Sequence, residues 1–138
     1  MLRLPDYKPS SMRGIDSNNP MVLVVEDNDD TRFFMRLALE GRGYRVCEAE
    51  NGERAIAVAC REQPNAILMD ISMPVLNGLT ATARIREHYE LRKIPIVALT
   101  AHKEEDLRAG AQACGFTAYV TKPIDVDWLD DLIRRLLQ

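Results

Sequence analysis

The sequence predicts an α/β domain, a doubly wound five-stranded parallel sheet with helices on both faces. Strand-like and helix-like patterns alternate from Met21 to the end of the chain, and this alternation is typical of parallel sheets. Four of the strand-like segments are continuous apolar runs, as expected for strands buried on both faces. The remaining one alternates apolar and charged residues, which indicates a strand at the edge of the sheet.

Four of the predicted strands lead directly into polar residues. MVLVV leads into Glu26, AILM into Asp70, IVAL into Thr100 and FTAYVT into Lys122. The alternating run, YRVCEAE, supplies the second strand. The predicted strands are residues 21–26, 44–49, 65–70, 95–100 and 117–121.

The edge position of the second strand sets the order of the sheet. Crossovers between parallel strands are nearly always right-handed. With the second strand at an edge, the expected order is 2-1-3-4-5, which is the flavodoxin-like arrangement. Strands one, three, four and five are then neighbours, and their carboxyl ends meet at one side of the sheet.

Helical patterns occupy the segments between the strands. The last one has the clearest period, with apolar residues three or four apart from Leu129 to Leu137, and Asp125 or Asp127 can cap its start. The fourth is the weakest because Gly110 lies inside it, and we expect this lightly packed helix to move. The predicted helices are residues 29–41, 52–62, 78–89, 103–113 and 125–137.

The first predicted helix is apolar over an unusually wide arc. We expect most of this arc to face the core. The alternative is that Phe33 and Leu37, one turn apart on its flank, dock a partner protein. The arc comprises Phe33, Phe34, Met35, Leu37, Ala38 and Leu39, and the polar side carries Arg32, Arg36 and Glu40.

Composition excludes several classes of protein. The 138 residues are 46% hydrophobic and 28% charged, which suits one globular domain. A net charge of -3 argues against a general nucleic-acid or membrane-surface binder, and no apolar stretch approaches the roughly 20 residues of a membrane span. Cys47, Cys60 and Cys114 form no CxxC pair, so we expect neither a disulfide framework nor a zinc site, and a cytoplasmic location.

The first twenty residues differ from the rest of the chain. They contain three prolines and show no periodicity, and they lack the apolar core of a signal peptide. We therefore predict a flexible tail over residues 1–20, followed by the domain over residues 21–138.

The polar residues at the strand ends suit phosphoryl chemistry. Open α/β sheets place ligands at the carboxyl ends of their strands, where Glu26, Asp27, Asp70, Thr100 and Lys122 would converge. A carboxylate can attack phosphorus to give an aspartyl phosphate. Mg²⁺ would relieve the repulsion among three carboxylates, while an ammonium and a hydroxyl would take other phosphate oxygens. Each residue alone has an ordinary reading as a helix cap, a loop residue or a surface group, but the conjunction favours a site.

These segments resemble the response-regulator receiver domain of two-component signalling. The resemblance covers about residues 21–137, and its motifs are VVEDN, ILMDISMPVLNG, IPIVALTA and YVTKP. It implies that Asp70 is the phosphoacceptor, that Asp27 is a direct Mg²⁺ ligand, and that Glu26 acts mainly through water. It also implies that the backbone carbonyl of Ser72 completes the metal site.

The resemblance extends to the residues that report phosphorylation. Thr100 matches the switch hydroxyl, Lys122 the lysine that pairs with the phosphoryl group, and Tyr119 the aromatic switch. The bond between Lys122 and Pro123 is expected to be cis. The implied response draws Thr100 to the phosphate, turns Tyr119 inward and repacks the fourth helix.

The resemblance implies a signalling module rather than an enzyme with external substrates. The expected partners are a histidine kinase or histidine-phosphotransfer protein and a downstream protein target. Aspartate-nucleophile phosphatases need a second acid two residues after the nucleophile, and Ser72 stands there, so turnover should be limited to the chain's own aspartyl phosphate. Two alternatives are a receiver fragment of a hybrid histidine kinase, which the stretch ACGFTAYVTKPID resembles, and an unphosphorylated docking module.

Overall fold

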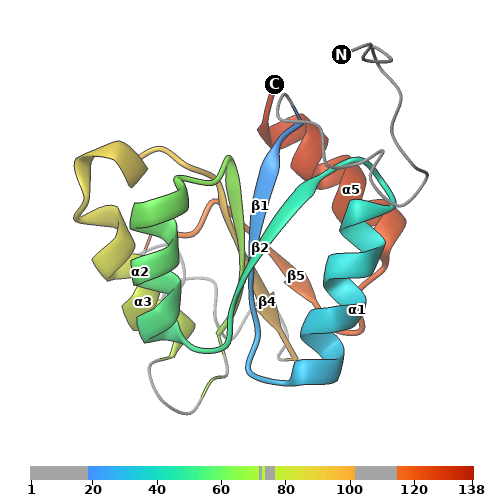
Figure 1. The fold of residues 1–138 in the computed structure, drawn as a ribbon, viewed down its shortest axis with the longest axis horizontal. Helices are drawn as coiled ribbons and strands as arrows, with labels where there is room; N and C mark the ends of the chain where they lie inside the picture. Colours follow the sequence, from blue (N-terminus) through green and yellow to red (C-terminus); the bar gives the residue numbers. More distant parts are fainter. Residues whose placement is uncertain (1–18, 72, 74–76, 102–114) are drawn as a thin grey trace, which may run out of the picture.

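A computed structural model describes residues 19–71, 73, 77–101 and 115–138. Strands and helices alternate along the chain, as predicted (Figure 1). The strands are Met21–Val25 (β1), Arg45–Ala49 (β2), Ala66–Asp70 (β3), Ile96–Thr100 (β4) and Ala118–Thr121 (β5). The helices are Asp29–Glu40 (α1), Gly52–Glu62 (α2), Gly78–Arg86 (α3) and Val126–Leu136 (α5), with a 3-10 turn at Tyr89–Leu91 (η2). The helix predicted at 103–113 lies outside the described residues, as do residues 1–18 of the predicted tail.

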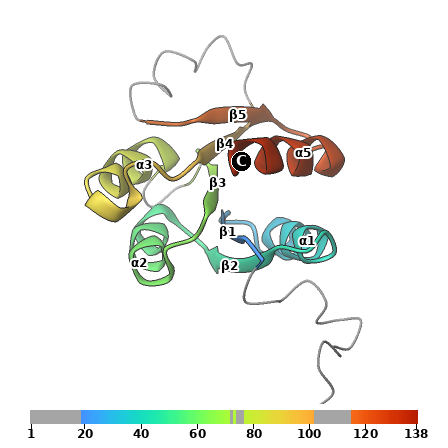
Figure 2. The same ribbon diagram turned by 90° about the horizontal axis from the view of Figure 1, so that it is seen from above.

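The strands form one parallel sheet in the order β2-β1-β3-β4-β5, which confirms the predicted topology (Figure 2). The edge position of β2 is also confirmed.

The prediction that residues 117–121 form a strand buried on both faces is wrong. β5 is the other edge of the sheet, where Ala118 and Tyr119 are only partly buried and Thr121 is exposed, because an edge strand has a neighbour on one side only.

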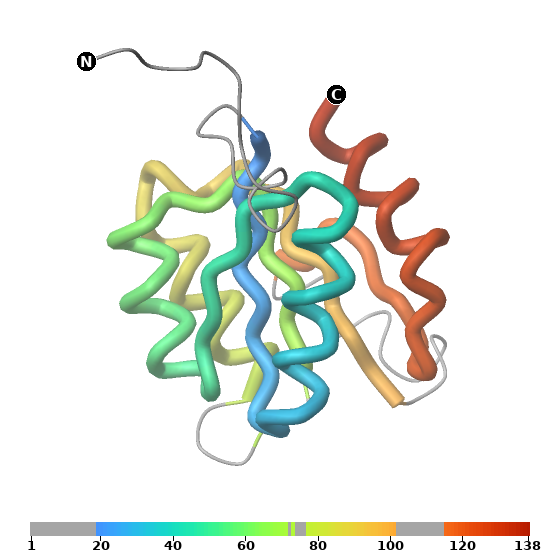
Figure 3. Tube along the Cα trace, turned by 45° about the vertical axis from the view of Figure 1, so that its right-hand side comes forward, coloured from blue at the N-terminus to red at the C-terminus, as the bar shows by residue number. Residues whose placement is uncertain are grey.

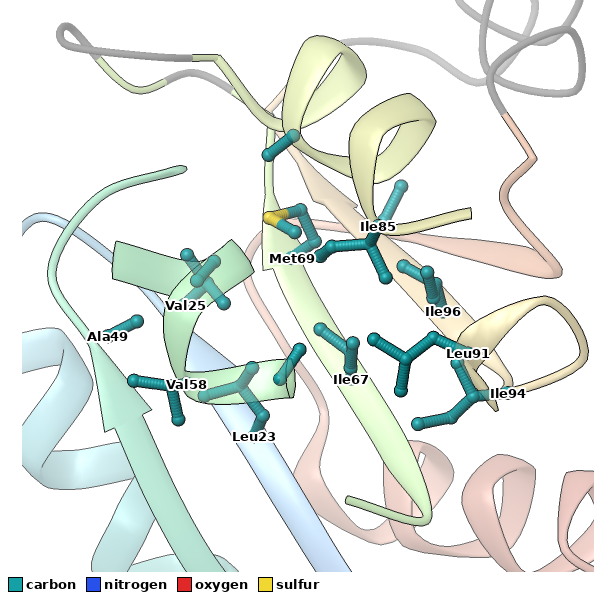
Figure 4. Packing of buried hydrophobic residues seen from close by; sticks show 14 of the residues in the cluster. Leu23, Val25, Ala49, Val58, Ile67, Met69, Ile85, Leu91, Ile94 and Ile96 are labelled. Atoms are coloured by element: carbon teal, nitrogen blue, oxygen red, sulfur yellow. The ribbon is translucent and has the colours of Figure 1, made fainter. Parts of the chain in front are cut away.

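Alternate residues of the strands supply two separate cores. In β1, Val22 and Val24 pack with residues of α1 and α5, whereas Leu23 and Val25 pack with residues of α2 and α3. Figure 4 shows the second of these cores filling the space between the sheet and α2 and α3. The period of two along a strand explains why an apolar run is needed here, since both faces of the sheet are covered. Within the described ranges, no helix combines the length and apolarity that crossing a bilayer requires.

Helix α1 covers the sheet with a narrower stripe than predicted. Met35 and Leu39, four residues apart, are buried, but Phe33 and Phe34 are each 60% exposed and Leu37 is 52% exposed. The expectation of a broad core face is therefore wrong. One stripe of α1 suffices to close this side of the core, and the other apolar side chains are left on the surface.

Side-chain caps fix where the helices begin. Asn28, Asn51, Asn77 and Asp125 each accept a hydrogen bond from the backbone N–H three residues later, at 2.8 to 3.2 Å. The expected capping role of Asp125 is thus confirmed. α3 ends at Arg86, earlier than predicted, because His88 has extended backbone angles and the chain turns into η2.

Candidate functional site

The carboxyl ends of the inner strands meet where β1 turns into α1, at the lower edge of the molecule in Figure 3. Backbone hydrogen bonds extend the strand pairing past the strand ends. The Ile71 N–H donates to Leu99 O at 3.2 Å, and the Lys122 N–H donates to Thr100 O at 2.7 Å. This pairing places the residues that follow β3, β4 and β5 side by side, as the strand order predicts.

Three carboxylates cluster at this edge. Glu26, Asp27 and Asp70 each offer an oxygen atom, and these atoms all lie within 4.8 Å of one another. Glu26 and Asp70 are buried, with 3% and 2% of their surface exposed, whereas Asp27 is exposed. The cluster therefore has an open side at Asp27 and a closed side formed by the other two residues.

Lys122 supplies the positive charge of the site. Its Nζ atom lies 3.2 Å from Glu26 Oε1 and 3.4 Å from Asp70 Oδ2. The peptide bond between Lys122 and Pro123 is cis, as the resemblance implied. One ammonium thus contacts two carboxylates that come from strands at different positions in the chain.

Burial and neighbouring charges shift the pKa values of Glu26 and Lys122. Burial raises the pKa of Glu26 from its usual 4.5 to about 7, and the neighbouring side chains of Asp27 and Asp70 add to this rise, while the Asn28 N–H opposes it. Burial lowers the pKa of Lys122, but attraction to Asp70 and Glu26 outweighs this effect and the pKa is raised overall. A cation placed among these carboxylates would offset the charge that burial disfavours.

The loop between β1 and α1 holds the acidic pair by hydrogen bonds on both sides. The Glu26 N–H donates to Ala49 O at 3.1 Å, and Glu26 Oε2 accepts from the Asn28 N–H at 3.2 Å. Asn28 in turn caps α1 through Thr31. The start of the helix and the end of the strand are therefore tied together around Asp27.

Close packing fixes the backbone around Asp70. A Cβ atom placed on Gly78 would lie 2.6 Å from Asp70 O and 2.7 Å from Ile71 Cα. Only glycine permits this approach of α3 to the end of β3. The Asn77-Gly78 pair in the sequence indicated a tight turn, and the structure shows that the turn presses directly on Asp70.

The predicted switch residues occupy neighbouring strands. Thr100 is the last residue of β4 and is buried, and Tyr119 in β5 is partly buried against the core beneath α2 and α3. The backbone register pairs Ala98 with Tyr119 and Thr100 with Thr121. Ser72, predicted to offer a backbone carbonyl, lies outside the described residues.

Sequence reasoning missed Arg32 as part of this region. It was placed on the polar side of the first helix, and the structure brings its guanidinium to Glu26 O at 2.8 Å. The available signal was the three-residue spacing from Asp29, which permits a side-chain pair on a helix. That spacing carries no information about a contact with the strand end.

The donor set fits a small, hard dication. Carboxylate oxygens gathered from two strand ends, with an open side at Asp27, match the preference of Mg²⁺ for a few carboxylates and retained water or phosphate ligands. The groups needed to compensate a phosphoryl group, a lysine and a buried hydroxyl, stand at the adjacent strand ends.

Comparison with known proteins gives a consistent result. Residues 22–134 match the family model of the response regulator receiver domain. The polar-differentiation response regulator DivK of Brucella anthropi is 37% identical over 120 residues, which cover 84% of this chain and 94% of DivK.

Solved structures give the same fold. Chemotaxis protein CheY4 of Vibrio cholerae superimposes with a TM-score of 0.83 at 28% identity, covering 86% of this chain and 99% of that chain. The receiver domain of sensor histidine kinase PA1611 from Pseudomonas aeruginosa PAO1 gives a TM-score of 0.80 at 34% identity, covering 86% of this chain and 98% of that chain, and it has a magnesium ion coordinated in its active site cleft. Family match, sheet order and acidic cluster agree, and this chain belongs to the response regulator receiver domain family of two-component signalling.

Proposed function

We propose that the chain accepts a phosphoryl group on Asp70, with Mg²⁺ bound by Glu26, Asp27, Asp70 and the Ser72 carbonyl. The donor is a phosphohistidine on a histidine kinase or histidine-phosphotransfer protein. One observation carries the proposal: three carboxylates have oxygens within 4.8 Å of one another, and the Lys122 ammonium lies 3.4 Å from Asp70. Repelling carboxylates gathered around a potential nucleophile make structural sense when a dication occupies the cluster.

The reaction is a transfer between two nucleophiles. A carboxylate oxygen of Asp70 forms a bond to phosphorus, and the bond from phosphorus to the donor imidazole nitrogen breaks with its electron pair returning to the ring. Bound Mg²⁺ supplies charge neutralisation for the phosphoryl oxygens. Lys122 pairs with another of these oxygens, and the Thr100 hydroxyl donates a hydrogen bond to a third.

The positions of Thr100 and Tyr119 on neighbouring strands support the proposed response. Drawing Thr100 toward the phosphoryl group changes the packing at the end of β4, next to the strand that carries Tyr119. An inward turn of Tyr119 then alters the β5 surface that a downstream protein target binds. Phosphorylation is thus a local charge event that biases a two-state element.

The family is not one of enzymes with external substrates, and we restrict turnover to the chain's own aspartyl phosphate. The free thiols of Cys47 and Cys60 suit the reducing cytoplasm in which we place this reaction.

Intact mass measurement tests the phosphoacceptor. The protein is incubated with Mg²⁺ and a small-molecule phosphodonor beside the Asp70→Asn variant. We expect a phosphoryl adduct on the wild type and none on the variant, and none on the wild type when a chelator removes the metal. No adduct on the wild type with either the small donor or a candidate kinase would support the docking module instead, and an adduct on Asp70→Asn would place the acceptor elsewhere.

The exposed apolar surface of α1 supports a docking role toward the phosphodonor protein. Phe33 and Leu37 lie one turn apart and are more than half exposed, and α1 begins directly after the acidic loop. Alanine at both positions should slow phosphotransfer from the protein donor at least tenfold, and leave phosphorylation by a small-molecule donor unchanged. Equal transfer from the protein donor in variant and wild type would contradict the docking role.

A further inference from the structure

The guanidinium of Arg32 holds both ends of the loop that presents Asp27. Its Nη1 atom donates to the backbone carbonyl of Glu26 at 2.8 Å, and its Nη2 atom donates to Asp29 Oδ1 at 2.6 Å. Residues on either side of Asp27 are therefore bound to the same planar group. A guanidinium suits this task because its donors form a rigid fork.

Asp27 itself is the exposed member of the acidic cluster. Burial and packing fix Glu26 and Asp70, whereas an exposed carboxylate on a loop is less restrained by packing. Its position depends on the backbone that carries it, and that backbone is held by Arg32 and by the hydrogen bond from Asn28 to Glu26. The geometry of the cluster on its open side thus depends on contacts outside the cluster.

Residues of the edge strand β2 contact Arg32 and the acidic loop that Arg32 holds. Glu48 Oε1 lies 3.6 Å from Arg32 Nε, and Glu48 Oε2 lies 2.8 Å from Arg36 Nη1. The next residue, Ala49, accepts the Glu26 N–H through its carbonyl. Two successive residues of β2 therefore anchor the acidic loop, one through its backbone and one through Arg32.

We infer that Arg32 is a positioning residue for the divalent metal, holding the carboxylate of Asp27 where it can coordinate. The inference rests on the proposed Mg²⁺ site. Arg32 does not touch the metal in this scheme. It acts through the Glu26 carbonyl and the Asp29 side chain, with Glu48 orienting it. Partners of this kind beyond the ligands typically change metal affinity by about 10- to 100-fold when removed.

Whether removal of Arg32 weakens or tightens Mg²⁺ binding distinguishes a positioning role from a purely electrostatic one. If Arg32 acted only through its charge, removing a cation near the site would lower the repulsion of Mg²⁺ and tighten binding. Loss of positioning has the opposite effect, because the Asp27 loop must be ordered by the metal itself. Weaker Mg²⁺ binding after removal of this positive charge would therefore indicate that Arg32 acts by positioning.

Calorimetric titration of the metal-free protein with Mg²⁺ tests the inference. We expect Arg32→Ala to weaken Mg²⁺ binding about tenfold. Arg32→Lys, which keeps the charge and loses the fork, should weaken it by about two- to fivefold and serves as the deciding variant if the alanine does not fold. The matched control is Arg36→Ala, because Arg36 pairs with Glu40 and Glu48 among the described residues; its Mg²⁺ affinity should stay within about twofold of the wild type.

A second readout excludes a general loss of structure. The Mg²⁺ concentration that gives half the maximal rate of phosphorylation by a small donor should rise in Arg32→Ala, while the rate at saturating Mg²⁺ stays close to that of the wild type. Equal or tighter Mg²⁺ binding in the Arg32 variants would overturn the positioning role. Absence of Mg²⁺ binding by the wild type would instead overturn the proposed function, so the two failures are distinguishable.

Discussion

Lys122 contacts Glu26 and Asp70 together, and so connects the two buried carboxylates of the cluster. Before transfer, its charge offsets two buried carboxylates. In the proposed transfer, the Asp70 oxygen that bonds to phosphorus loses its share of the carboxylate charge, so the ammonium would pair with the new phosphoryl oxygens.

Gly78 strictly limits substitution near Asp70. Two of the three atoms that a Cβ would meet, Asp70 O at 2.6 Å and Ile71 Cα at 2.7 Å, belong to the backbone and cannot move aside as a flexible side chain can. We expect Gly78→Ala to lower the free energy of unfolding by about 2 kcal/mol or more. Displacement of the Asp70 backbone should also reduce phosphorylation. Urea unfolding and intact mass after incubation with a phosphodonor measure both effects.

Gly41 offers the matched control for this substitution. It lies at the end of α1 with φ of -63°, a conformation that alanine adopts freely. Gly41→Ala should change the free energy of unfolding by less than about 1 kcal/mol and leave phosphorylation intact. Similar losses in both glycine variants would show that close packing on Asp70 is not the cause.

Among the elements, α3 is joined to its neighbours by one arginine. Arg86 near its end donates to Gly115 O at 3.0 and 2.7 Å, to Leu91 O at 2.9 Å and to Ile94 O at 2.5 Å. These carbonyls belong to η2, to the approach to β4 and to the approach to β5. A single side chain thus fixes three segments at the end of the sheet opposite the acidic cluster, and burial lowers the pKa of its guanidinium.

Replacing Arg86 should loosen these segments together. Arg86→Ala removes the arginine donor from the carbonyls of Leu91, Ile94 and Gly115, and we expect a loss of about 3 kcal/mol in the free energy of unfolding. Arg86→Lys should recover only part of it, because an ammonium cannot reach all of these acceptors. Arg84→Ala, on the exposed side of the same helix turn, should cost less than about 0.5 kcal/mol. Chemical denaturation of the three variants measures these losses. A loss for Arg86→Ala as small as that for Arg84→Ala would contradict the anchoring role.

Over the whole molecule, α5 is connected by polar contacts to the segment between α1 and β2, and by the core to α1 itself. The buried Tyr44 donates its hydroxyl hydrogen to Asp130 Oδ1 at 2.6 Å. Arg42 forms ion pairs with Asp127 and Asp130, and Arg134 donates to Arg42 O at 2.8 Å. These contacts therefore link the segment that follows α1 to α5 on one face of the sheet.

How much could be predicted from the sequence depends on the kind of interaction. Strand order and the convergence of Glu26, Asp70 and Lys122 followed from local patterns and topology, because the carboxyl ends of neighbouring parallel strands must meet. The exposure of Phe33 could not be predicted in this way, since it depends on how wide a stripe of α1 the sheet covers. The contact of Arg32 with Glu26 O and those of Arg86 were also missed, because these acceptors are backbone carbonyls, which every residue type carries.

The buried charge of the site also sets how the stability of the metal-free protein depends on pH. Glu26 binds its proton more tightly in the folded state, with a pKa of about 7, than at its usual value of 4.5. Between these values the folded protein holds more protons than the unfolded chain. The contribution of Glu26 to stability is therefore fully present below pH 4.5 and is lost as the pH rises through about 7.

Comparison with Glu26→Gln isolates this contribution from the other acidic groups. The amide cannot ionise, so the variant should gain stability relative to the wild type as the pH rises from 4.5 to 7, and the difference should level off above pH 7. Urea unfolding in the presence of a chelator, at several pH values across this range, gives the difference. A difference that stays constant with pH would mean that Glu26 ionises at its usual pKa, and that the ammonium of Lys122 fully offsets the cost of burying the carboxylate.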